Sequence, residues 1–206
     1  ATPTSERHKF HQKNYNILFF LLVIVTILVG ISIPLLNERV IIGGLSLAVI
    51  IGLYLFLQRY LPLKEFFVAG LYTFGVLLPS WRLKVDLISG DHVLLIGQFF
   101  SVALVNLLLF SWFEYENDLQ DGHSSIAIRW GKTLCAKLII ILGIISLCLS
   151  GWMIMYSPYI MATSIFLLMM AILMWMLFFH SYFIKNARYR LLGDAVFFLS
   201  LIGLFL

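Results

Sequence analysis

The chain has 206 residues, of which 62% are hydrophobic, and its mean hydropathy is +1.00. Soluble globular domains average about 45–50% apolar residues, so this composition excludes a soluble domain and predicts an integral membrane protein. The formal net charge of +4 does not indicate nucleic-acid binding, because membrane proteins collect Lys and Arg in their cytoplasmic joints through topology alone.

The apolar residues form long continuous runs rather than alternating with polar ones, which predicts an all-α, polytopic transmembrane helical bundle. Residues 1–14 are polar and basic and are expected to form a cytoplasmic interfacial arm. The helical domain, 15–206, then contains seven expected membrane spans. They cover residues 15–36, 40–57, 66–81, 92–113, 134–156, 160–182 and 191–206.

The distribution of basic residues predicts the orientation of these spans. With the arm in the cytoplasm, eleven of the fourteen Lys and Arg residues fall on the cytoplasmic side, and only Arg39, Arg82 and Lys84 fall on the other. The joint after the fourth span is then cytoplasmic and the C-terminus lies outside. That joint is unusual because it is rich in acidic residues.

Four of the ten acidic residues lie between positions 114 and 121, namely Glu114, Glu116, Asp118 and Asp121. Residues four apart share a helical face, so Asn106, Glu114 and Asp118 are expected to point together with Phe110 between them. The Asp-Gly pair at 121–122 should end this helix.

Glu114 and Asp118 are the best pair to share a divalent cation, with Asp121 just behind them. Hard oxygen ligands favour Mg²⁺ or Ca²⁺, and Mg²⁺ commonly binds one or two carboxylates together with the oxygens of a phosphorylated substrate. Arg129 and Lys132 follow in the same joint and could bind a diphosphate. The alternative is that all these charges are solvated and paired with one another.

The acidic segment resembles the second acidic motif of the UbiA-type intramembrane aromatic prenyltransferases. The resemblance rests on Glu-Tyr-Glu-Asn-Asp at 114–118 and on Gly-His-Ser-Ser-Ile-Ala-Ile-Arg-Trp-Gly at 122–131. It extends to Leu-Lys-Glu at 63–65, to Tyr72 and Gly75-Val76, and to the run from Tyr189 to Asp194.

The resemblance implies a Mg²⁺-dependent enzyme that transfers a prenyl group from a prenyl diphosphate to an aromatic or other lipophilic acceptor, in a membrane expected to be the bacterial inner membrane. Glu114 and Asp118 would be catalytic, Asp121 would join them in holding the metal, and Asn106, Arg129 and Lys132 would bind substrate. The family has nine helices, so the seven spans would be its helices three to nine. A first acidic motif is then expected upstream, and the chain alone is not expected to be active.

Several positions depart from the family pattern. Glu114 stands where Asp is usual, Ser124 where a base is common, and Asn106 and Phe110 where Tyr and Lys often precede the motif. These departures leave open a non-catalytic membrane protein that retains the fold. A small transporter is a third alternative, although its spans should contain more charged residues. For Asp194, an i,i+4 pair with Arg190 is expected.

Overall fold

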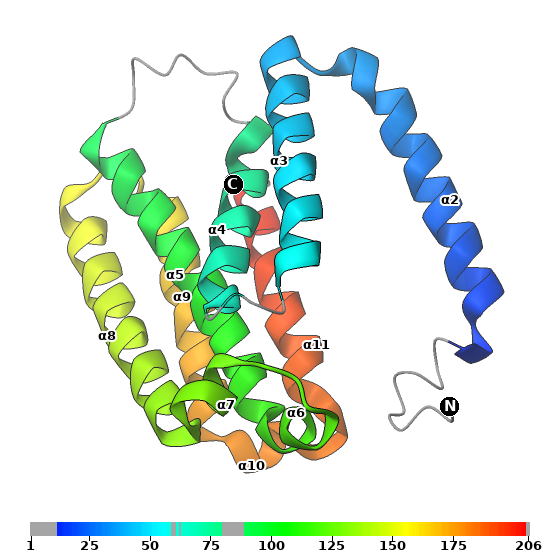
Figure 1. Ribbon diagram of the computed structural model, residues 1–206. Helices are drawn as coiled ribbons and strands as arrows, with labels where there is room; N and C mark the ends of the chain where they lie inside the picture. Colours follow the sequence, from blue (N-terminus) through cyan, green and yellow to red (C-terminus); the bar gives the residue numbers. More distant parts are fainter. Residues whose placement is uncertain (1–11, 59–60, 62, 80–88, 205–206) are drawn as a thin grey trace.

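The computed structural model describes residues 12–58, 61, 63–79 and 89–204, so most of the predicted arm at 1–14 lies outside the described residues (Figure 1). Every regular element in these ranges is a helix, which confirms the all-α fold. The α-helices are α2 (Tyr15–Ser32), α3 (Glu38–Leu57), α4 (Lys64–Leu77), α5 (Gly90–Phe113), α6 (Tyr115–Asp121), α7 (Ile126–Trp130), α8 (Lys132–Tyr156), α9 (Ile160–Phe178), α10 (His180–Phe183) and α11 (Arg188–Ala195). Short 3-10 helices are η1 (Ile33–Leu35), η4 (Lys185–Ala187) and η5 (Val196–Leu204).

Among the described residues, five helices are long and apolar enough to cross a membrane: α2 together with η1, then α3, α5, α8 and α9. A bilayer core about 30 Å thick needs about 20 helical residues. By contrast α4 has 14 residues, and the last predicted span is divided between α11 and η5. The membrane-embedded helical bundle is therefore confirmed, whereas the predicted count of seven spans is not.

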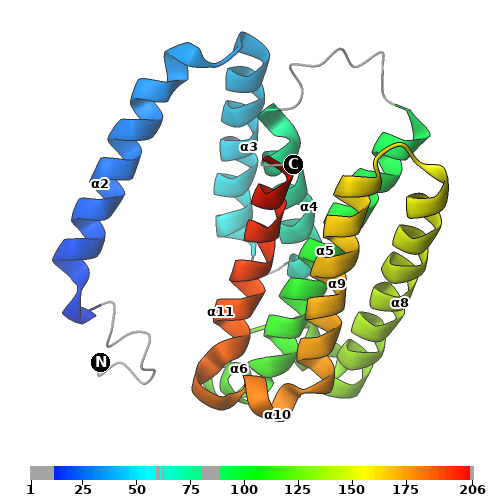
Figure 2. The ribbon, with the colours of Figure 1, turned by 180° about the vertical axis from the view of Figure 1, so that it is seen from behind.

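The centre of the bundle is α5, which packs against α4, α7, α8, α9 and α11. It buries apolar side chains around its whole circumference, including Val102, Leu104, Val105, Leu108 and Leu109. A helix that is apolar on all sides gains most when neighbours surround it. In the same bundle α11 packs against α5 and η5 packs against α9 (Figure 2).

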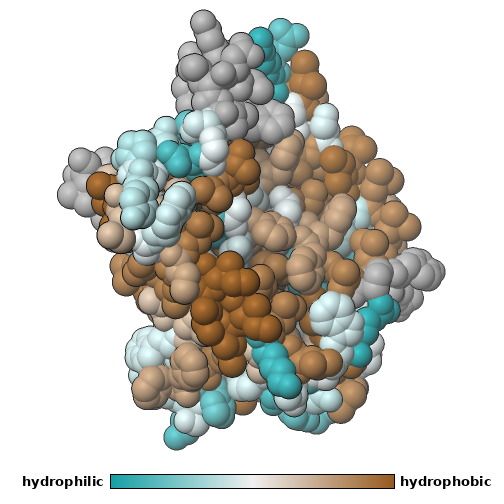
Figure 3. All heavy atoms as spheres, turned by 90° about the vertical axis from the view of Figure 1, so that its left-hand side faces the viewer, coloured by the Kyte–Doolittle hydropathy of each residue, from teal (hydrophilic) through white to brown (hydrophobic). Residues whose placement is uncertain are grey.

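The outer faces of the helices are strongly hydrophobic. On α8, the large side chains Ile141, Ile144, Ile145 and Trp152 are each at least half exposed. Figure 3 shows hydrophobic residues dominating the middle of this face, with hydrophilic residues toward its upper and lower ends. Helix α2 buries none of its residues and stands apart from the bundle in Figure 1. Such surfaces suit contact with lipid rather than water.

Candidate functional site

The acidic segment begins at a bend between α5 and α6. Glu114 sits at the bend with φ −88° and ψ 3°, while its N–H donates to the Phe110 carbonyl and its own carbonyl accepts from the Asp118 N–H. In Figure 1 α5 runs along the bundle and α6 is seen nearly end-on, so the helix axis turns. The single straight face expected from residue 106 to residue 118 therefore holds only as far as Glu114.

The helix α6 ends where the sequence predicts. Gly122 follows Asp121 with φ +68°, and the His123 N–H donates to the Asp118 carbonyl. Glycine reaches this left-handed conformation without the steric penalty that a Cβ brings. The acidic residues of α6 are thus confined to fewer than two turns of helix at one end of the bundle.

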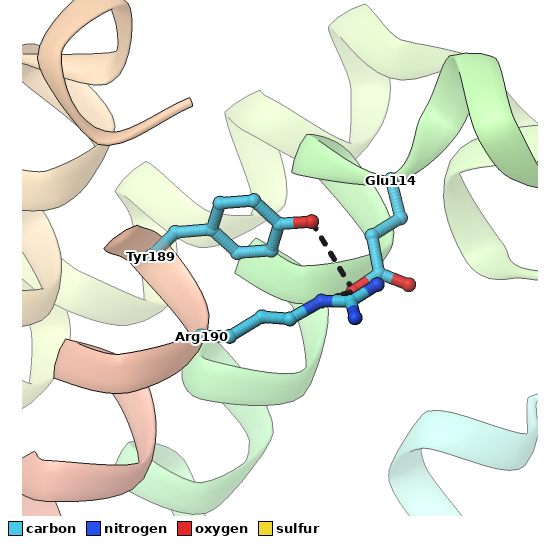
Figure 4. Close-up of polar contacts among 3 residues, drawn as sticks. All are labelled: Glu114, Tyr189 and Arg190. Atoms are coloured by element: carbon cyan, nitrogen blue, oxygen red, sulfur yellow. Dashed lines mark hydrogen bonds and ion pairs between the residues drawn. The ribbon is translucent and has the colours of Figure 1, made fainter. Parts of the chain in front are cut away.

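The carboxylate of Glu114 is held by two residues from the start of α11. Arg190 Nε donates to Glu114 Oε1 at 2.9 Å, and the Tyr189 hydroxyl donates to the same oxygen at 3.4 Å (Figure 4). The ring of Tyr189 stacks on Phe113 with centroids 4.5 Å apart. Both contacts attach α11 to the end of α5.

This arrangement shifts two pKa values. Burial of the hydroxyl, followed by the nearby Glu114 carboxylate, raises the pKa of Tyr189. Burial disfavours the charged guanidinium of Arg190, but the attraction of Glu114 and the contact with Tyr189 outweigh it, and the pKa of Arg190 is raised. Arg190 therefore stays charged and neutralises Glu114.

One turn and two turns before Glu114, Phe110 and Asn106 face Gly193 of α11. A Cβ at Gly193 would lie 2.6 Å from Phe110 Cε1 and 2.7 Å from Asn106 Oδ1, so α11 approaches α5 this closely only because position 193 is glycine. Asn106 is 4% exposed, and its Oδ1 has no hydrogen-bond partner among the described residues.

Asn106 and Phe110 also line a cavity of about 520 Å³ between α4, α5, α11 and η5. Tyr72, Asp194 and Phe197 contribute to the same wall. Its lining is mostly apolar, with the amide of Asn106 and the carboxylate of Asp194 as the polar groups nearest the acidic end. Asp194 forms no ion pair with Arg190 among the described residues, so the expected i,i+4 pair is replaced by the pair between Arg190 and Glu114.

A second cavity of about 460 Å³ lies between α3 and α4 and is lined by Leu47, Ile51, Tyr54 and Gly75 among others. Val68 and Tyr72 line both cavities. The two spaces are therefore adjacent, with the side chains of α4 between them.

The other predicted metal ligands, Asp118 and Asp121, lie on α6, beyond the bend at Glu114. Asp118 is half-buried and Asp121 is exposed, and no hydrogen bond or ion pair joins either carboxylate to another described residue. Within the described ranges no three His, Cys, Asp or Glu side chains gather closely enough to hold a metal ion. On donor chemistry Asp118 and Asp121 suit a hard cation such as Mg²⁺, and Glu114 does so through Oε2, because Arg190 and Tyr189 both use Oε1.

The predicted diphosphate-binding bases flank this segment. Arg129 is exposed in the last turn of α7, and Lys132 opens α8. Lys132 Nζ lies 3.8 Å from Glu116 Oε1 and 5.0 Å from the centre of the Trp112 ring. The acidic segment and both bases thus lie at the same end of the bundle.

The helix α7 is anchored by two residues from other helices and by its own N-cap residue. Its first three N–H groups donate to Glu65 Oε1 of α4 at 2.9 Å, to Ser111 Oγ of α5 at 3.2 Å and to Ser125 Oγ at 3.4 Å. The Gly-x-x-Ser-Ile-Ala-Ile-Arg segment is therefore packed against the bundle, with Ile126 and Ala127 fully buried.

Glu65, Tyr189 and Arg190 were not among the predicted site residues. A signal for Arg190 exists, because the topology count places the basic joint before α11 on the same side as the acidic segment. No comparable signal identifies Glu65, since its partner is a backbone N–H 61 residues further along the chain.

Comparison with known proteins finds no match: no family model, no curated protein and no solved structure matches this chain.

Proposed function

We propose that the protein is an integral membrane prenyltransferase that uses Mg²⁺ to transfer a prenyl group from a prenyl diphosphate to an aromatic or other lipophilic acceptor. The observation that carries this proposal is the juxtaposition at one end of the bundle. Carboxylates on α6 and the bases Arg129 and Lys132 lie at this end. An apolar cavity lies along α5 from the same end, and the residue that lines it nearest to Glu114 in the chain is Phe110, one turn away.

In this reaction the diphosphate head lies at the polar end of the site. Arg129 and Lys132 donate to its oxygens, and two of the three carboxylates Glu114, Asp118 and Asp121 would hold the metal together with diphosphate oxygens. Bound Mg²⁺ would supply positive charge that stabilises the leaving pyrophosphate. The allylic C–O bond breaks, pyrophosphate leaves with the bonding electrons, and an electron pair of the acceptor forms the new bond as the acceptor loses a proton.

The apolar wall of the larger cavity has two roles in the proposal. It accommodates the prenyl chain, and it keeps water from the allylic cation, which water would otherwise capture. The ring of Phe110 lines this cavity, where an aromatic face can stabilise a cation. The amide of Asn106 lies one turn deeper and binds a polar group of the substrate.

The proposed location is the bacterial inner membrane, with the acidic segment on the cytoplasmic side. It rests on the excess of Lys and Arg in the joints that share this side with the segment. Labelling of Asp121→Cys by a membrane-impermeant maleimide, in inverted and in right-side-out vesicles, tests the orientation. Reaction in right-side-out vesicles alone would contradict it.

Activity is tested with the full-length protein in lipid nanodiscs, a labelled prenyl diphosphate, Mg²⁺ and a panel of phenolic and quinol acceptors. The combined substitution Glu114→Ala and Asp118→Ala should abolish transfer. The matched control is Asp91→Ala, which removes an acid from the first turn of α5 at the opposite end of the same helix. Transfer that persists in the double variant would refute the site assignment.

A second candidate is a non-catalytic membrane protein that retains the fold. The observation that favours it is the engagement of Glu114 by both Arg190 and Tyr189, which compensates the carboxylate without any metal. Calorimetric titration of the full-length protein with Mg²⁺ and inorganic pyrophosphate separates the two functions. Binding that depends on Asp118 favours the enzyme, and the lack of binding favours the non-catalytic protein.

A further inference from the structure

Glu65 is a buried acid that the proposed chemistry does not use. It lies in the first turn of α4 and is only 6% exposed. A carboxylate is costly to remove from water unless it gains a strong contact. The contact that Glu65 gains is the N–H of Ile126, at 2.9 Å from Oε1.

The partner of Glu65 is a helix that depends on outside contacts. With only five residues, α7 is too short to be stable through its own hydrogen bonds. Its first N–H groups have no acceptor within the helix, and Ile126 and Ala127 are fully buried, so water cannot replace a missing acceptor. The orientation of α7 is consequently determined by Glu65, Ser111 and Ser125.

The bases of the candidate site are attached to this helix. Arg129 lies in its last turn, and Lys132 follows after Gly131, which adopts φ +90°. A rotation of α7 would therefore move Arg129 directly, and would move Lys132 through Gly131. The contacts of Lys132 with Glu116 and Trp112 would change with it.

We propose that Glu65 is a positioning residue: its hydrogen bond to Ile126 holds α7 so that Arg129 and Lys132 stay at the same end of the bundle as the acidic segment. The proposal rests on the proposed function, in which these two bases bind a diphosphate. Glu65 acts through the backbone of α7 and does not touch the substrate. The site then depends on α4 as well as on α6, α7 and α8, because Glu65 of α4 holds α7 in place between α6 and α8.

Two substitutions can test the hydrogen bond of Glu65 and its negative charge separately. Oε2 has no hydrogen-bond partner among the described residues, so only Oε1 is engaged. Glu65→Gln keeps the length of the side chain and an oxygen acceptor but removes the charge. Glu65→Asp keeps the charge but withdraws it by one methylene. If the hydrogen bond is what matters, the Gln variant should resemble the wild type more closely than the Asp variant does.

The first measurement is hydrogen exchange of the full-length protein in nanodiscs, followed in the peptides that cover residues 123–131. In Glu65→Ala and Glu65→Asp, the α7 amides should exchange about tenfold faster, as expected for the loss of one charge-assisted hydrogen bond. Glu65→Gln should stay within about threefold of wild type. Thr73→Val is the control, since Thr73 is buried on the same helix and, among the described residues, its hydroxyl bonds to the Ala69 carbonyl alone.

The second measurement is the affinity for inorganic pyrophosphate in the presence of Mg²⁺. We expect Glu65→Asp to weaken it about tenfold and Glu65→Gln to weaken it less than threefold, in parallel with exchange. Unchanged exchange in the Asp variant, or an Asp variant closer to wild type than the Gln variant, would overturn the proposal. So would faster exchange with unaltered affinity. If wild type itself binds no pyrophosphate, the proposed function fails, and exchange alone decides whether Glu65 anchors α7.

Discussion

Arg190 and Glu114 are 76 residues apart in the chain, and their 2.9 Å ion pair connects the start of α11 to the bend that opens the acidic segment. The guanidinium occupies one oxygen of the carboxylate that the sequence marks as a metal ligand. A metal ion at this site must therefore either share Glu114 with Arg190 or displace it.

Removal of Arg190 should strengthen binding of Mg²⁺. The pair is partly solvated, with side chains 35% and 24% exposed, so its strength is about 1 kcal/mol and the affinity should rise about fivefold in Arg190→Ala. Calorimetric titration with Mg²⁺ measures this change. Arg188→Ala is the matched control, because Arg188 lies over the Tyr182 ring and not beside Glu114. An equal gain in both variants would indicate a general effect of net charge.

The raised pKa of Tyr189 predicts a loss of stability in alkali. Since the folded protein holds this proton more tightly than the unfolded chain, the contribution is fully present below pH 10 and is lost as the pH rises through the pKa of the folded state. Thermal unfolding of wild type should therefore show a steeper decline above pH 10 than unfolding of Tyr189→Phe. Parallel declines would mean that Tyr189 does not titrate within the folded site.

Gly193→Ala should destabilise the contact between α5 and α11. The added Cβ would meet Phe110 and Asn106, and overpacking of this kind costs about 1–3 kcal/mol. Gly97→Ala supplies the comparison, because a Cβ at this exposed position of α5 meets no atom within 4 Å. It should instead stabilise the helix by about 0.5–1 kcal/mol. Thermal unfolding in nanodiscs distinguishes the two outcomes.

Asn106→Leu should change stability and activity in opposite directions. The buried Oδ1 has no partner among the described residues, so replacing the amide with an apolar group of similar shape should stabilise the protein by about 1 kcal/mol. If Asn106 binds a polar group of the substrate, turnover should fall at least about tenfold. A variant that is both more stable and fully active would exclude Asn106 from substrate binding.

The helical fold was predictable because long apolar runs have one stable form in lipid. The end of α6 was predictable for a similar reason, since the Asp-Gly pair at 121–122 has a strong local preference. The bend at Glu114 was not, because residues 106–118 retain a helical pattern and the change of axis depends on packing against α7 and α11. The number of spans predicted from the apolar runs was not confirmed either. The helix α4 has only 14 residues, and the last apolar run is divided between α11 and η5.

The residues of the candidate site also fall into two groups, those that the sequence could identify and those that it could not. Clustering in the sequence identified Glu114 and the acids of α6, because these lie close together along the chain. The partners of Glu114 and the role of Glu65 depend on contacts between distant helices. Charge on a joint indicates only the side of the membrane on which a residue lies, so it could place Arg190 near the acidic segment but could not select its partner.

Tyr72 and Val68 line both cavities, so side chains rather than helix backbones separate the two spaces. Tyr72 is the larger of them, and it is held by rings from two other segments, stacking on Phe99 and meeting Phe197 edge-on. A smaller residue at position 72 would widen the space between the cavities without moving a helix backbone. The extent of each apolar space is therefore set by side chains of α4, so a substitution at position 72 can change it while the fold stays the same.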